Sequence, residues 1–130
     1  MKTICLSLAA LALALATFNS PALAIAPFSN AFKDKYVKPG APLEEKVAKA
    51  KCNVCHLGKN RKNRNEYGKA VQLYLKKADF AGKDKKYDPK SEEGQKLLFE
   101  GLEKASAEKN ADGKIFLELI TAGELPAGSE

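Results

Sequence analysis

An all-α fold is predicted by two properties of the sequence. Apolar residues recur at the three-four spacing of amphipathic helices, and no alternating run of apolar and polar residues is long enough for a sheet. The clearest helical pattern spans residues 65–78, with apolar positions at Tyr67, Ala70, Val71, Tyr74, Leu75 and Ala78. Of the 130 residues, the 106 that follow Ala24 suffice for one small domain and not for two.

Residues 1–24 have the pattern of a secretory signal peptide. Lys2 supplies the positive charge, residues 4–18 form an apolar stretch, and Ala22-Leu23-Ala24 is a small-x-small cleavage site. A cut after Ala24 would leave an exported, periplasmic protein. The apolar run is shorter than the about 20 residues that a membrane helix needs, so we expect no stable membrane insertion.

The mature chain is expected to begin with an irregular lead-in, residues 25–40, ahead of the main domain at residues 41–130. The prolines and glycine of the lead-in argue against regular structure. A helix is then predicted from Leu43 to about Cys52, with Pro42 at its start. Residues 58–65 are basic and rich in asparagine, which predicts a solvated loop.

Three further helices are expected after this loop. The first is the periodic segment at residues 65–78. The second begins at Asp88 or Ser91 and runs to about Lys109, and Pro89 favours Asp88 as its cap. The last begins near Asp112 and ends at Gly123, a residue suited to a left-handed C-terminal position.

The run Cys52-Asn53-Val54-Cys55-His56 has the spacing used for covalent haem attachment. Two thiols separated by two residues can each form a thioether with one porphyrin vinyl group. The adjacent imidazole can bind the iron as the proximal ligand. The sequence therefore predicts one haem c, with Cys52, Cys55 and His56 as cofactor-binding residues and His56 as the metal ligand.

Two other chemistries use paired cysteines. A zinc site needs four ligands, and these three residues have no further cysteine or histidine in the mature chain to complete one. A dithiol oxidoreductase places its Cys-x-x-Cys pair at a strand-to-helix junction, and the sequence predicts no strand before the motif. Both remain weaker alternatives to haem.

A helix leading into Cys52–His56, then a loop and two or three helices, resembles a small monohaem class I cytochrome c over residues 41–123. The resemblance implies a helical domain around one covalent haem, with two thioethers and a proximal histidine. Members usually carry a distal methionine in a loop before the final helix. They also commonly have a Gly-Pro pair soon after the histidine, where this chain has Leu57-Gly58-Lys59-Asn60.

The mature chain has no distal methionine, because Met1 leaves with the signal peptide. A second histidine and a third cysteine are absent as well. The sixth iron position is then open, or takes a ligand from another protein, or takes an unusual internal ligand. A lysine would have to lose its proton at a cost of ~4.6 kcal/mol at pH 7, a tyrosine at ~4 kcal/mol, and the Ile25 amine at about 1 kcal/mol. The tyrosines are Tyr36, Tyr67, Tyr74 and Tyr87.

Charge and size leave two functions open. Without Lys2 the chain has 21 basic and 16 acidic residues, a net charge of +5, which is consistent with an acidic redox partner and equally with lysines that keep the protein soluble. The sequence has no aromatic residues interleaved with basic ones and no recognised motif that would indicate nucleic-acid binding. Size and the lack of a second histidine favour a non-enzymatic electron carrier. The missing methionine favours a haem protein that binds or acts on NO, CO or peroxide.

Overall fold

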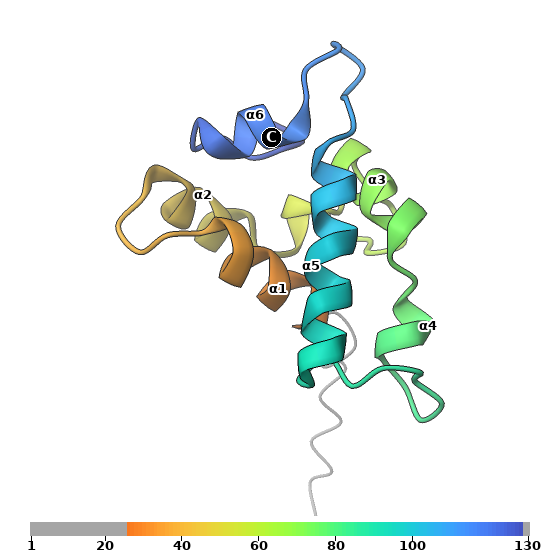
Figure 1. Cartoon of the computed structure of the whole chain (residues 1–130). Helices are drawn as coiled ribbons and strands as arrows, with labels where there is room; N and C mark the ends of the chain where they lie inside the picture. Colours follow the sequence, from red (N-terminus) through yellow and green to blue (C-terminus); the bar gives the residue numbers. More distant parts are fainter. Residues whose placement is uncertain (1–25, 129–130) are drawn as a thin grey trace, which may run out of the picture.

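The computed structural model describes residues 26–128, of which 56% are helical, so the all-α prediction is confirmed at this level. The predicted signal peptide lies outside the described residues. In the described part, no helix is long and apolar enough to cross a membrane. The elements are α1 (Ala26–Tyr36), α2 (Pro42–Ala50), the 3-10 helix η2 (Lys51–Val54), α3 (Glu66–Tyr74), α4 (Lys77–Phe80), α5 (Glu92–Ser106) and α6 (Phe116–Thr121) (Figure 1).

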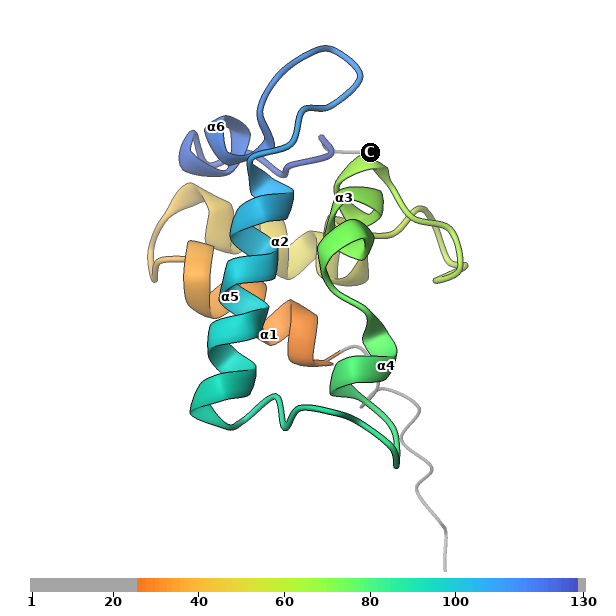
Figure 2. The same ribbon diagram turned by 45° about the vertical axis from the view of Figure 1, so that its right-hand side comes forward.

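The long helix α5 is the central element. Helices α1 and α3 both pack against it, and α6 contacts it near its C-terminal end (Figures 1 and 2). Gly101 in the middle of α5 allows a close approach, because a Cβ atom there would come within 2.3 Å of Leu75 Cδ2. The chain after α3 is thereby held against the central helix.

Aromatic rings connect α1, α3 and α6 in the core. The Tyr67 ring lies 5.7 Å from that of Phe32 and 5.3 Å from that of Phe116, edge to face in both pairs. Tyr67 is fully buried, and its hydroxyl forms a 3.0 Å hydrogen bond with Ser106 Oγ of α5. A buried phenol needs such a partner. The core therefore packs the central helix α5 together with α1, α3 and α6.

The prediction of an irregular lead-in was wrong for most of residues 25–40. Residues Ala26–Tyr36 form α1, with Pro27 in the first turn, where a proline costs no intrahelical hydrogen bond. Burial of Phe32, which is 3% exposed, holds the helix on the domain. The segment is part of the domain core and not a separate lead-in.

The helix before the motif begins as predicted and ends slightly earlier than predicted. It starts at Pro42, and the α-helical part ends at Ala50 before η2. The predicted helix at residues 65–78 is interrupted, because α3 ends at Tyr74 and Leu75 is extended, with α4 following from Lys77. Burial of Leu75 against α5 outweighs the continuous helical pattern of this segment.

The caps of the last two helices differ in part from the predictions. Ser91, and not Asp88, caps α5, and its Oγ accepts a 3.0 Å hydrogen bond from the Gly94 amide. Helix α6 begins at Phe116 instead of near Asp112, because Gly113 adopts a φ of 79° in a turn. The predicted C-terminal glycine is confirmed, since Gly123 has a φ of 78°.

Candidate functional site

The Cys-x-x-Cys-His motif lies in a tight turn directly after α2. The amides of Cys55 and His56 both donate to the Cys52 carbonyl, at 3.2 and 3.0 Å. The chain enters the turn through Lys51, whose φ of 51° is the one positive value at a non-glycine residue within 26–128. Such a backbone costs about 1–3 kcal/mol. It ends α2 abruptly and starts the motif turn at Cys52.

The three predicted site residues line one cavity of about 950 Å³. This volume lies at the upper end of the range for cofactor and small-molecule sites, about 300–1,000 Å³. Its apolar walls come from α1, α2, η2, α3 and the segment after α3, with Phe28, Phe32, Val47, Val54, Val71 and Leu75 among the lining residues. The fold thus places the motif at a cavity large enough for a cofactor.

The imidazole of His56 is oriented by a backbone carbonyl. Its Nδ1 lies 3.2 Å from the Asn63 carbonyl oxygen, which also accepts the Leu57 amide at 3.1 Å. With Nδ1 donating this hydrogen bond, Nε2 is left as the ring nitrogen with a lone pair available to a metal ion. The loop of residues 57–63 therefore braces the histidine without the Gly-Pro pair common in class I cytochromes c.

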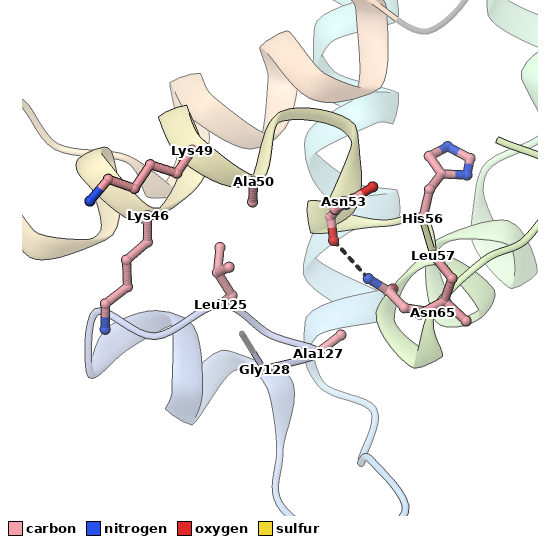
Figure 3. A pocket seen from close by; sticks show the side chains of 10 residues that line it. All are labelled: Lys46, Lys49, Ala50, Asn53, His56, Leu57, Asn65, Leu125, Ala127 and Gly128. Atoms are coloured by element: carbon pink, nitrogen blue, oxygen red, sulfur yellow. Dashed lines mark hydrogen bonds between the residues drawn. The ribbon is translucent and has the colours of Figure 1, made fainter. Parts of the chain in front are cut away.

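Asn65 is a site residue that the sequence analysis did not single out. Its Nδ2 donates to the Asn53 carbonyl at 3.0 Å (Figure 3) and to the Val54 carbonyl at 3.1 Å, and its Oδ1 accepts a hydrogen bond from the Gly68 backbone amide at 2.8 Å. The backbone amide of Asn65 also donates to the Cys55 carbonyl at 3.1 Å. Asn65 therefore caps α3 and fastens the motif turn to it.

Helix α3 approaches the motif at Gly68. A Cβ atom at this position would lie 1.9 Å from the Cys55 carbonyl oxygen, far inside contact distance. Only a glycine lets the first turn of α3 rest directly on the motif backbone. The side of α3 that carries Gly68, Val71 and Gln72 forms one wall of the cavity.

Cys52 and Cys55 are free thiols in the structure. Burial raises the pKa of the Cys55 thiol to about 12, with a further increase from Cys52 and an opposing decrease from Arg64. The thiol is therefore protonated at neutral pH. Within residues 26–128, no three Cys, His, Asp or Glu side chains gather closely enough to hold a metal ion.

Six cationic side chains line the cavity, and among the described residues no Asp or Glu lines it. We call them the cationic collar: Lys51, Arg61, Lys62, Arg64, Lys76 and Lys77. None of the six takes part in an ion pair within residues 26–128, where the six ion pairs all use other lysines. The fold thus concentrates uncompensated positive charge at one cavity.

The structure does not bring the tyrosines to the cavity. None of the four is among its lining residues in the described chain. Tyr36 donates to the Leu102 carbonyl at 3.3 Å, Tyr67 pairs with Ser106, and Tyr74 donates to Glu108. Burial raises the pKa of both Tyr36 and Tyr67 above the usual tyrosine range. The geometry therefore gives no support to a tyrosinate ligand.

A second cavity of about 300 Å³ lies between α2, the motif and the C-terminal residues (Figure 3). The His56 ring points away from its Lys46 and Leu125 side. Its two lysines are already paired, Lys46 with Glu124 at 2.7 Å and Lys49 with Glu45 at 2.6 Å. The lysines of this smaller cavity are paired with carboxylates, whereas those of the cationic collar are not paired within residues 26–128.

No family model, curated protein or solved structure matches this chain. The features of the molecule that bear on its function are therefore the larger cavity, the motif residues that line it and the cationic collar around it.

Proposed function

We propose that this protein is a monohaem c-type cytochrome. Cys52 and Cys55 would hold the haem through thioethers, and His56 would be its proximal ligand. The observation that carries the proposal is that all three line one cofactor-sized cavity, with the His56 ring oriented through Nδ1 by the Asn63 carbonyl. The haem would supply an iron that cycles between the ferrous and ferric states.

The walls and rim of the cavity fit the two chemical parts of haem. Aromatic and aliphatic side chains of α1, α2 and α3 offer apolar contact to the porphyrin. Arg64 is half-buried beside the motif, lines the cavity and has no carboxylate partner in residues 26–128. A guanidinium matches the geometry of a carboxylate. Arg64 is therefore the side chain best suited to bind a haem propionate.

The proposed role is transfer of single electrons between redox partners after export to the periplasm. Arg61 and Lys62 are exposed in the loop after the motif and also line the cavity. Exposed cations at this point would steer an acidic partner to the cofactor at low ionic strength. The signal-peptide pattern of residues 1–24 supports an exported location.

A second candidate function is the binding of a small ligand at the sixth iron position. It is supported by Ser29 and Gln72, two polar side chains that line the cavity from α1 and α3. A haem pocket uses such groups to hold or activate a ligand.

Covalent attachment is the first test of the proposed function. The protein should be produced in a host that exports it and attaches haem, then purified and extracted with acid-acetone. We expect a mass equal to the mature chain plus one haem, with colour retained in the protein. The Cys52→Ala/Cys55→Ala variant should lose both, whereas Leu73→Ala, at a 72% exposed position, should keep both. A wild-type mass equal to the bare chain would overturn the proposal.

A further inference from the structure

The charge of the cavity exceeds what a haem would balance. Two propionates would compensate two of the six collar cations and leave four. The surplus is not shared with protein carboxylates, since among residues 26–128 no Asp or Glu lines the cavity and no collar residue forms an ion pair. Arg64 is half-buried and the other five collar residues are exposed, so at low ionic strength their combined field attracts anions to the cavity.

Two of the collar residues stand apart from the motif and its loop. Lys76 is extended between α3 and α4, and Lys77 is the first residue of α4. Gln72 lines the same cavity one turn earlier on α3, and Ser29 lines it from α1. This part of the wall therefore combines two positive charges with an amide and a hydroxyl, both hydrogen-bond donors.

We propose that this wall makes the cavity a binding site for a small inorganic anion, attracted by Lys76 and Lys77 and accepting hydrogen bonds from Gln72 and Ser29. The proposal rests on the proposed haem and names the charge class of the ligand that would enter beside it. Neutral gases such as CO gain nothing from the two ammonium charges. An anion of the size of azide or nitrite gains from both.

The test compares an anionic with a neutral ligand on the ferric holoprotein. Azide and imidazole are titrated at low ionic strength and about pH 8, where imidazole is neutral, and the haem absorption band reports binding. We expect the Lys76→Gln/Lys77→Gln variant to bind azide about tenfold more weakly and imidazole within about twofold of wild type. The control is Lys83→Gln/Lys90→Gln, which removes the same charge at exposed positions outside the cavity. It should bind azide as wild type does.

Three results would overturn the proposal. They are no azide response in wild type, equal azide losses in the two double variants, or a changed resting spectrum in Lys76→Gln/Lys77→Gln that identifies a lysine as the iron ligand. Each result is obtained on protein whose mass already includes haem. Failure of the anion site is therefore distinguishable from failure of the cytochrome assignment.

Discussion

A single buried side chain, Asn65, joins the motif turn to α3. Its side-chain amide forms hydrogen bonds with two carbonyls of the turn and one backbone amide of the helix. Each of these bonds replaces a hydrogen bond to water that the backbone group loses when it is buried. The same turn holds His56, whose ring is oriented by the next loop. The position of the imidazole thus depends on Asn63 and Asn65, which are not among the described residues that line the larger cavity.

Asn65→Ala should destabilise the protein by about 2–4 kcal/mol, because it removes a helix cap and two further hydrogen bonds. The matched control is Ser91→Ala, which removes the cap of α5 and one further hydrogen bond, from Ser91 Oγ to the Asp88 carbonyl, and should cost about 1–2 kcal/mol. Urea unfolding of both variants measures the difference. Equal losses would show that the two hydrogen bonds from Asn65 to Asn53 and Val54 stabilise the protein no more than the single bond from Ser91 to Asp88.

At the residue scale, the motif could be predicted from sequence and the rest of the site could not. Cys52, Cys55 and His56 are adjacent and their spacing encodes a known chemistry. The collar comes from separate segments of a chain with 22 basic residues, so no spacing distinguishes Lys76 from a solvated lysine. Asn65 ends a basic segment that also contains Asn60 and Asn63, so its role as a helix cap could not be separated from that of a loop residue.

At the element scale, α1 is a wall of the larger cavity that was not expected from the sequence. Pro27, Pro39 and Gly40 predict irregular structure for this segment, whereas Phe28 and Phe32 have the spacing of one helix face. A helix tolerates proline in its first turn, and its own stability here comes from tertiary packing. The interruption after α3 has the same origin, since the partner of Leu75 is Gly101, distant in sequence.

Phe32→Ala should cost about 3–5 kcal/mol, because it opens a cavity between α1 and Tyr67. Leu73→Ala on α3, 72% exposed, should stay within about 0.5 kcal/mol of wild type. Thermal or urea unfolding of the haem-loaded protein tests this. A cost below about 1 kcal/mol for Phe32→Ala would mean that α1 is not a structural part of the domain.

At the scale of the whole molecule, α3 contributes both to the wall of the larger cavity, through Val71 and Gln72, and to the buried core, through Tyr67. Its hydroxyl is buried against Ser106, and burial raises its pKa, with the Ser106 hydrogen bond opposing the increase. The folded state therefore holds this proton more tightly than the unfolded state, whose tyrosine pKa is about 10. The resulting stability is fully present below about pH 10 and is lost as the pH rises further.

Tyr67→Phe should therefore lower stability by about 1 kcal/mol at neutral pH, through loss of the hydrogen bond. Its stability should then decline less steeply than that of wild type above about pH 10. Unfolding free energies measured from about pH 8 to 11 give both slopes. Parallel slopes would show that another group, and not Tyr67, governs the alkaline loss of stability.

The position of the cavity along the chain has a consequence for biosynthesis. The described residues that line the cavity all lie between Phe28 and Ala78. Helix α5, against which α1 and α3 pack, follows later in the sequence. During synthesis from the N-terminus, every wall of the cavity therefore leaves the ribosome before the helix that holds the walls together. A nascent chain that ends before residue 92 carries the complete lining and lacks its scaffold.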